Sequence, residues 1–161
     1  MTLSLRPTGA PDLEFVMALE ADPDASPFVT VWSREQHDHA IADPDQAHLV
    51  VSDGDESVGF VLLAGLESPH RNVELRRIVV ATRGRGLGRE VLALVLDRAF
   101  GALGAHRVWL DVKPHNERAL GAYRAVGFVH EGVLRDALLT EGEWESLAIM
   151  SVLEHEWSER R

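Results

Sequence analysis

Cysteine is absent from this 161-residue chain. The protein can therefore form no disulfide, no thiolate metal site and no cysteine nucleophile. Basic residues are also scarce, because 16 lysines and arginines stand against 26 aspartates and glutamates, for a formal net charge of −10. Nucleic-acid binding depends on neutralising phosphates, so this balance argues against a nucleic-acid partner and leans weakly toward cationic partners such as amines or basic peptides.

Long apolar segments are missing as well. No run approaches the roughly 20 residues that a membrane-spanning helix needs. The N-terminus, MTLSLRPTGAPDL, lacks a basic region followed by an apolar stretch, so no signal peptide is expected. We expect a cytoplasmic protein without a membrane partner. With 45% hydrophobic residues, the chain is long enough for one globular domain spanning residues 1–161.

Hydrophobic periodicity and turn residues predict alternating strands and helices. Apolar residues at gaps of three and four between residues 88 and 103 form one broad helix face, which must pack on a sheet. Asp12 and Ser33 are placed to cap the first two helices, and Gly127 is placed to end the last. The expected strands cover residues 3–6, 47–52, 57–66, 73–80, 106–113, 128–139 and 143–153, and the expected helices cover residues 12–20, 33–42, 88–103 and 116–126.

The connections indicate how the strands pair. Short turns favour antiparallel hairpins, whereas the helix between strands 73–80 and 106–113 is a crossover that favours a parallel pair. The expected fold class is α/β, with a mixed, mostly antiparallel central sheet of about seven strands, one parallel pair and about four helices. Trp157 is expected to pack against the body, with the last charged residues frayed.

The stretch IVVATRGRGLGR, residues 78–89, joins a strand-like run to a helix-like run across closely spaced glycines. Glycine lets backbone N–H groups approach a ligand, and a helix N-terminus adds unpaired N–H groups and the positive end of a dipole. The turn therefore predicts an anion site suited to a pyrophosphate. Its glycines are Gly84, Gly86 and Gly88, and Arg83, Arg85 and Arg89 add positive charge.

Two nucleotide-binding motifs do not fit this turn. A Walker loop requires a Gly-Lys-Ser/Thr ending, which is absent. A dinucleotide fingerprint requires glycine at the position of Arg89. A glycine turn that merely begins an ordinary surface helix stays open as an alternative.

Arg83, Gly86 and Gly88 also fill a signature of Gln or Arg, two variable residues, Gly, one variable residue, and Gly or Ala. A second element, DVKPHNERALGAYRAVGF at residues 111–128, follows at the expected distance. With these two motifs the chain resembles the GNAT superfamily of N-acetyltransferases. It looks closest to the ribosomal-protein N-terminal acetyltransferase subgroup, on the segments LRPTGAPDLEFV, ELRRIVV and GEWESLAIMSVLEHEW.

This resemblance implies an acetyl-CoA-dependent enzyme whose parallel strand pair is splayed. The pantetheine arm would lie in the gap, paired like an extra strand with the backbone around residues 78–80, and a backbone N–H would stabilise the tetrahedral oxyanion. No metal is implied. The residues that the resemblance assigns to donor binding are Ile78, Val79, Val80, Arg83, Gly84, Arg85, Gly86, Leu87, Gly88, Arg89 and Asn116.

Direct transfer requires a neutral amine, so a group must remove a proton from the ammonium. Glu74 and Asp111 match places where superfamily members keep a catalytic carboxylate, and each equally suits a solvated position on a strand. Tyr123 lies seven residues after Asn116 on the same helix face and matches the general acid that protonates the coenzyme A thiolate. A core tyrosine with a satisfied hydroxyl is the alternative reading of Tyr123.

The segment between the first two helices usually borders the acceptor pocket in this superfamily, although core packing is the stronger explanation for its apolar residues. For Arg76 and Arg77 the sequence is equally consistent with surface charges and with neighbours of the acceptor site. His37 and His39 diverge on a helix, so they do not predict a metal pair. The apolar residues in question are Phe28, Val29, Val31 and Trp32.

The sequence thus predicts direct acetyl transfer from acetyl-CoA to a primary amine, either a protein N-terminus or a small molecule. A homodimer is feasible because sheet edges and the final hairpin offer pairing surfaces. A noncatalytic acyl-CoA-binding sensor is the alternative function. Such a sensor would need the glycine turn but neither Tyr123 nor a nearby carboxylate.

Overall fold

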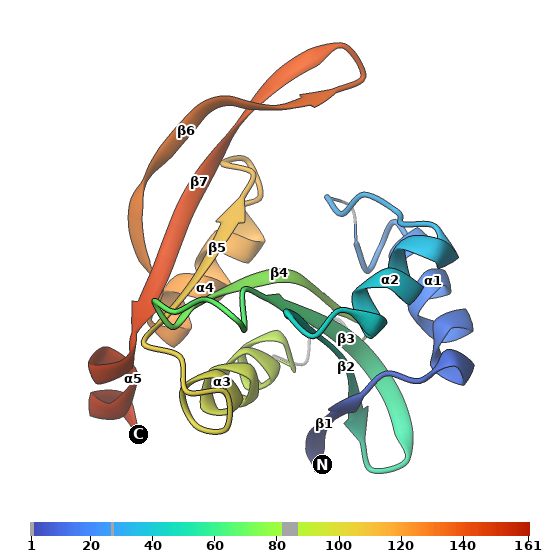
Figure 1. The fold of residues 1–161 in the computed structure, drawn as a ribbon. Coiled ribbons are helices and arrows are strands. Elements are labelled where there is room, and N and C mark those ends of the chain that lie inside the picture. The colour runs from blue at the N-terminus through green and yellow to red at the C-terminus, as the bar shows by residue number, and fades with distance from the viewer. Residues whose placement is uncertain (1, 27, 82–86) are drawn as a thin grey trace.

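The computed structural model describes residues 2–26, 28–81 and 87–161. Within these residues seven strands form one sheet in the order β1-β2-β3-β4-β5-β7-β6 (Figure 1). The strands are β1 (Leu3–Pro7), β2 (Gln46–Asp53), β3 (Glu56–Ala64), β4 (Asn72–Val80), β5 (Arg107–Val112), β6 (Val129–Thr140) and β7 (Glu143–Leu153). The helices are α1 (Leu13–Ala21), α2 (Arg34–Ala42), α3 (Leu87–Phe100), α4 (Glu117–Val126) and α5 (Glu154–Arg160), and a 3-10 turn, η1 (Ala10–Asp12), precedes α1.

The strand directions confirm the predicted fold class. β4 and β5 are parallel, while the other neighbouring strands of the described sheet are antiparallel. The crossover between β4 and β5 contains α3, as the sequence pattern predicts. The Ser33 side chain accepts a hydrogen bond from the Gln36 N–H at the start of α2, and Gly127 adopts a φ of 114° at the end of α4, so both predicted caps are confirmed.

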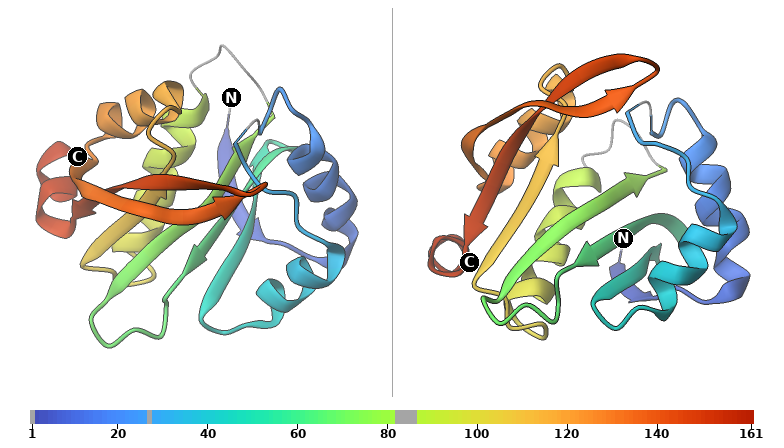
Figure 2. Two further views of the ribbon diagram at one scale, coloured as in Figure 1. Left: turned by 90° about the horizontal axis from the view of Figure 1, so that it is seen from above. Right: turned by 45° about the horizontal axis from the view of Figure 1, so that its top comes forward.

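Helices cover both faces of the sheet. Figure 2 shows α1 and α2 on one face and α3 and α4 on the other. The larger core packs α3 side chains such as Val91 and Val95 against the strands. The smaller core packs α1 against Phe60 of β3 and Val79 of β4. The apolar stripe predicted for residues 88–103 therefore lies on the sheet.

A β-bulge at Arg76 changes which side chains of β4 face each layer. β3 residues Leu62 and Leu63 pair with Arg77 and Leu75, so Arg76 is the extra residue. Side chains alternate between faces along a strand, and one extra residue reverses the alternation. Val73 and Leu75 face the larger core before the bulge, Ile78 and Val80 pack against it afterwards, and Val79 joins the smaller core.

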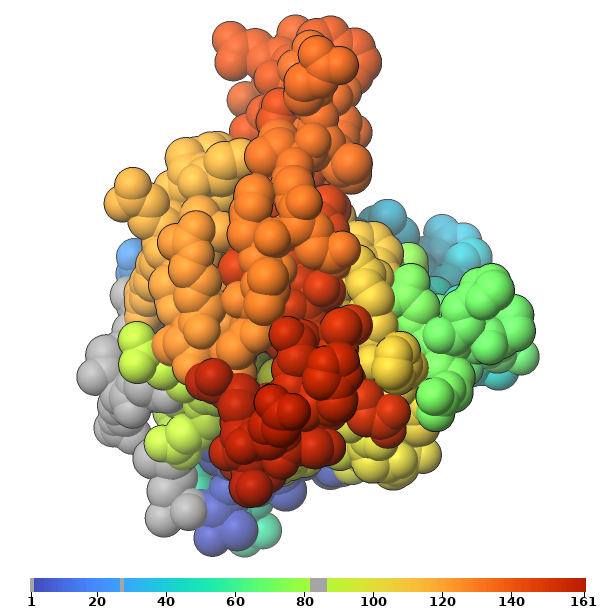
Figure 3. Space-filling view, turned by 90° about the vertical axis from the view of Figure 1, so that its left-hand side faces the viewer, coloured from blue at the N-terminus to red at the C-terminus, as the bar shows by residue number. Residues whose placement is uncertain are grey.

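The hairpin of β6 and β7 extends beyond the body of the molecule (Figure 1). β6 is an edge strand of the sheet. In the space-filling view the end of this hairpin stands clear of the other elements (Figure 3). The exposed large hydrophobic residues of the hairpin are Val129, Val133, Leu134, Leu139 and Trp144.

Two local predictions are wrong. Asp12 makes no capping hydrogen bond to α1, because its carboxylate accepts from the Gly9 N–H at 2.8 Å within η1 and pairs with Arg6 at 2.8 Å. The C-terminus does not fray but forms a fifth helix, α5. Trp157 is buried there as predicted, and its indole donates to Asp97 at 2.9 Å, while Arg160 donates to the Ala125 carbonyl at 2.9 Å.

Candidate active site

The parallel strands β4 and β5 separate after three paired residues. β4 pairs with β5 only from Asn72 to Glu74, yet it continues to Val80. The two strands start side by side and diverge toward their carboxyl ends (Figure 2, right). The bulge at Arg76 lies two residues after Glu74, the last residue paired with β5, so β4 changes direction just beyond the end of the pairing. The edge of β4 from Leu75 to Val80 thus faces a gap, as the resemblance implies.

Two cavities open along this gap and meet in the middle. The helix-side cavity has a volume of about 260 Å³, and the hairpin-side cavity has a volume of about 370 Å³. Both are lined by Phe28, Val29, Ile78, Asn116 and Tyr123. The helix-side cavity adds Asp24, Ala25, Ser26, Val80, Gly88, Leu92, Arg118, Ala119 and Ala122. The hairpin-side cavity adds Thr30, Trp32, Leu75, Arg76, Arg77, Asp111, Val112, Lys113, Leu138 and Leu147.

Tyr123 lies at the junction of the two cavities. Its ring packs edge-on against Phe128 of the core at 5.6 Å between centroids. Burial, with a smaller contribution from the nearby Asp111 carboxylate, raises the pKa of Tyr123 to about 12. The phenol therefore holds its proton at neutral pH and is available as a proton donor.

Asn116 reaches the same junction from the start of α4. Its side-chain oxygen accepts a hydrogen bond from the Ala119 N–H at 3.2 Å and so caps the helix. This bond uses the carbonyl oxygen of the amide, so the amide NH₂ remains the donor that can face a ligand. The cap fixes the side chain at the boundary of both cavities.

Asp111 stands out among the charged residues of the hairpin-side cavity. The three basic side chains there have partners: Arg76 pairs with Glu74 at 2.9 Å, Arg77 with Glu20 at 2.6 Å, and Lys113 with Glu145 at 3.4 Å. In the described part of the chain, no ion pair or hydrogen bond engages the Asp111 carboxylate. Partial burial and the Glu74 charge raise the pKa of Asp111, while Arg76 opposes the shift.

Glu74, the second predicted carboxylate, lines neither cavity. Its Oε1 atom accepts hydrogen bonds from Arg76 Nε at 3.0 Å and from Arg76 Nη2 at 2.9 Å. This pairing occupies Glu74 at the surface, away from both cavities. Of the two predicted carboxylates, Asp111 is therefore the one placed to accept a proton within the cavity.

Besides Asn116, the predicted donor-binding residues lie in several different places. Ile78, Val80 and Gly88 line the helix-side cavity, and the Val79 side chain packs into the smaller core on the opposite face. Leu87 is buried in the core, while Arg89 is exposed. The predictions for Arg83, Gly84, Arg85 and Gly86 fall outside the described residues.

Residues 28–33, which precede α2 and are called the acceptor loop below, hold the apolar side chains that the sequence analysis considered for the acceptor pocket. Phe28 and Val29 line both cavities and Trp32 lines the hairpin-side cavity, whereas Val31 is exposed. Phe28 also packs edge-on against His115, with ring centroids 5.1 Å apart, so the loop touches the turn before α4 across the gap.

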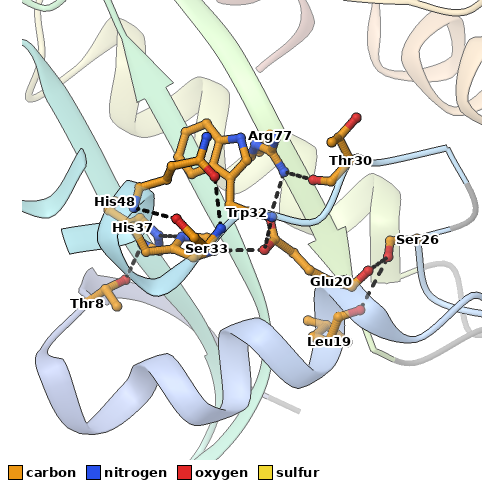
Figure 4. A network of polar contacts seen from close by, with 11 residues as sticks. Thr8, Leu19, Glu20, Ser26, Thr30, Trp32, Ser33, His37, His48 and Arg77 are labelled. Atoms are coloured by element: carbon orange, nitrogen blue, oxygen red, sulfur yellow. Dashed lines mark hydrogen bonds and ion pairs between the residues drawn. The ribbon is translucent and has the colours of Figure 1, made fainter. Parts of the chain in front are cut away.

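A buried polar cluster beneath this loop was missed by the sequence analysis (Figure 4). It joins Glu20 to His37, His48 and Arg77. One signal could have revealed it: Glu20 lies seven residues after Leu13 on the apolar face of α1, where a charge requires a buried partner.

Neither a metal-binding cluster nor a membrane-spanning helix is found among the described residues. They contain no group of three or more histidines, aspartates or glutamates arranged to hold a metal ion. None of their helices combines the length and apolar character needed to cross a membrane.

Comparison with known proteins identifies the family. The model of the acetyltransferase (GNAT) family matches residues 13–128. The chain belongs to the GNAT family. This acetyltransferase is 28% identical over 167 residues to a spermidine N(1)-acetyltransferase of Escherichia coli K12, a match that covers 97% of this chain and 88% of the relative. It is 33% identical over 107 residues to the N-alpha-acetyltransferase RimI of Mycobacterium tuberculosis, covering 65% of each chain.

Solved structures agree with this assignment. The spermidine N-acetyltransferase of Vibrio cholerae in complex with CoA and spermine superposes with a TM-score of 0.84 at 26% identity, covering 97% of this chain and 98% of that one. The protein is thus an acetyl-CoA-dependent N-acetyltransferase with the GNAT fold. The predicted family, fold, reaction and acyl donor are confirmed.

Proposed function

We propose that this acetyltransferase transfers acetyl from acetyl-CoA to a small primary amine, with Asp111 as the general base and Tyr123 as the general acid. The proposal rests on one observation above all: Asp111 is the unpaired charge of the described hairpin-side cavity, which meets the helix-side cavity at Tyr123. A carboxylate in a cavity whose cations are already paired attracts an ammonium group. The cytoplasm remains the proposed location, because the donor is a cytoplasmic metabolite.

The helix-side cavity is the proposed donor half. It offers the open edge of β4, the apolar side chains of Ile78 and Val80, and the small Gly88 at the start of α3. An extended pantetheine arm can pair with such a strand edge through its amides. Asn116, which borders both cavities, is the proposed side-chain donor to that arm.

The proposed reaction has two linked proton transfers. The acceptor reacts as the neutral amine, after its ammonium form has lost one proton to water. The nitrogen attacks the thioester carbonyl, the N–C bond forms, and the C–S bond breaks. Asp111 accepts the proton that leaves the nitrogen, and Tyr123 donates a proton to the departing sulfur. The raised pKa of each group supports this division, because Asp111 binds a proton more readily than a solvated aspartate and Tyr123 stays protonated beforehand.

The choice of a small amine over a protein N-terminus rests on the relatives. The spermidine enzyme of E. coli aligns with 97% of this chain, whereas the match to the M. tuberculosis N-alpha-acetyltransferase covers 65%. The hairpin-side cavity also supports it, since Trp32, Leu138 and Leu147 enclose it from the acceptor loop and from both strands of the hairpin.

Free-thiol release from acetyl-CoA, measured against a panel of polyamines, monoamines, amino-acid derivatives and N-terminal peptides, tests this function. Mass spectrometry of each acceptor identifies the acetylated atom. We expect turnover with at least one small amine and at least tenfold lower kcat/KM with every peptide. Turnover confined to peptides would contradict the acceptor class, and acetyl-CoA binding without turnover on any acceptor would favour the sensor alternative.

A second copy of the chain is the proposed protein partner. β6 presents an open strand edge, and its hairpin carries exposed apolar side chains that the body of the chain leaves uncovered (Figure 3). We expect sedimentation velocity at micromolar concentration to give twice the mass of one chain, and Trp144→Arg to give a single-chain mass. A wild-type protein that sediments as one chain would contradict the dimer.

A further inference from the structure

Glu20 is a charged side chain placed in the interior of the protein. Its side chain is 0% exposed, and it lies on the apolar face of α1 beside Val16 and Leu19. Burying an isolated carboxylate is strongly unfavourable, so its partners decide whether the fold tolerates it. Three donors from three different elements surround it.

Both oxygens of the carboxylate accept hydrogen bonds from these donors. Oε1 accepts hydrogen bonds from His37 Nε2 of α2 at 2.7 Å and from the Trp32 backbone N–H at 3.2 Å. Oε2 accepts a hydrogen bond from Arg77 Nη1 of β4 at 2.6 Å. Glu20 therefore ties α1, α2, the acceptor loop and β4 together at one point (Figure 4).

The inner end of this cluster is a chain of contacts through His37, His48 and Thr8. His37 Nδ1 lies 3.0 Å from His48 Nε2, and His48 Nδ1 lies 2.8 Å from the Thr8 hydroxyl. The His48 ring stacks on Phe60 with centroids 5.6 Å apart. Burial lowers the pKa of His48 to about 4, so this ring is neutral at pH 7.

The outer end of the cluster reaches the hairpin-side cavity. The Arg77 guanidinium lies 4.0 Å from the centroid of the Trp32 ring, and its Nη1 also donates to the Thr30 carbonyl at 2.6 Å. Trp32, Thr30 and Arg77 all line that cavity. The bulge at Arg76 is what turns Arg77 toward α1, because the unbroken alternation of β4 would direct it to the opposite face.

We infer that Glu20 is a positioning residue for the acceptor loop, acting through Arg77 and the Trp32 backbone to hold the loop over the acceptor half of the site. The inference rests on the proposed function, since it takes the hairpin-side cavity as the acceptor half. Glu20 touches neither substrate. Removal of the Glu20 carboxylate is expected to weaken acceptor binding and to loosen the acceptor loop. Binding of acetyl-CoA should not change.

Glu20→Gln tests this role with minimal change in shape. The amide keeps one acceptor oxygen but presents N–H donors where His37 or Arg77 also donates. We expect the KM of the acceptor to rise about tenfold, in keeping with the loss of one charge-assisted hydrogen bond, and the Kd of acetyl-CoA to stay within about twofold. Glu35→Gln, on the exposed surface of α2, is the matched control.

A double variant separates positioning from stability. Glu20→Gln with Arg77→Gln leaves no unpaired charge in the core, so the melting temperature should recover toward that of the wild type. The Trp32 ring and the Thr30 carbonyl still lack their cation, so the acceptor KM should remain raised. An acceptor KM that recovers together with the melting temperature would overturn the inference.

Amide hydrogen exchange of residues 28–33 gives a readout that needs no acceptor. We expect Glu20→Gln to speed exchange in this loop at least tenfold, with β5 and α4 unchanged and Glu35→Gln equal to the wild type. This result stands even if the protein acetylates no amine, so failure of the proposed function is distinguishable from failure of the inference. If Glu20→Gln lowers the melting temperature but leaves the acceptor KM and the loop exchange at their wild-type values, Glu20 has only a structural role and the inference is wrong.

Discussion

Replacing Tyr123 by phenylalanine is expected to lower kcat by about 100- to 1,000-fold, the usual contribution of a general acid. The substitution removes only the hydroxyl, so the ring keeps its contact with Phe128. Because the pKa of Tyr123 is raised to about 12, the wild-type hydroxyl should supply its proton without a loss of activity up to about pH 10. Stopped-flow or steady-state thiol release measures the change in kcat.

Binding measurements separate this effect from damage to the site. Calorimetry should give an acetyl-CoA Kd within about twofold of the wild-type value, because the phenol is assigned to proton transfer and not to binding. Trp157→Phe is the matched control, since it removes another aromatic hydrogen-bond donor, the one to Asp97, away from both cavities. A Tyr123→Phe enzyme with wild-type kcat would end the general-acid assignment.

Replacing Asp111 by asparagine is the second large expected loss. Without a carboxylate to accept the proton, kcat/KM for the amine should fall by about 100-fold. The free energy of unfolding at pH 7 should not fall in this variant. A folded-state pKa raised above the unfolded value gives stability that is present below the unfolded pKa and is lost as pH rises through the folded pKa. At pH 7 the ionised Asp111 carboxylate therefore destabilises the folded state, and an uncharged asparagine removes this effect. The melting temperature at pH 7 should equal or exceed that of the wild type.

Glu74→Gln distinguishes the two predicted carboxylates. Glu74 is paired with Arg76 and lines neither cavity, so its loss should reduce kcat/KM by less than about tenfold. Thermal melting also compares Asp111→Asn with the wild type at pH 7 and at pH 4. The difference in melting temperature between these two proteins should be smaller at pH 4. A loss in Glu74→Gln equal to that in Asp111→Asn would move the role of base to Glu74.

Much of the fold could be predicted because it follows from local periodicity. The stripe of α3, the Ser33 cap and Gly127 each depend on residues within a few positions, and each is found where the pattern indicates. α5 was missed because a seven-residue helix depends on contacts with distant elements, such as the bond between Trp157 and Asp97.

The site was predictable in part for the same reason. Asn116 and Tyr123 share a helix face by spacing alone, and both lie at the junction of the cavities. The bulge at Arg76 could not be read from the sequence, because it is defined by the pairing of β4 with β3. The cluster around Glu20 likewise brings together distant residues, since His37 lies 17 positions from Glu20 and Arg77 lies 57 positions from it. Only the charge on the apolar face of α1 indicated it in the sequence.

The most direct test of this account is a crystal structure of the acetyltransferase with coenzyme A bound. We expect the pantetheine arm to run along the open edge of β4 between Leu75 and Val80, with its sulfur within hydrogen-bond reach of the Tyr123 hydroxyl. Asp111 should then lie on the hairpin side of the sulfur. Coenzyme A bound away from the gap between β4 and β5, or a sulfur out of reach of Tyr123, would contradict the assignment of the two cavities.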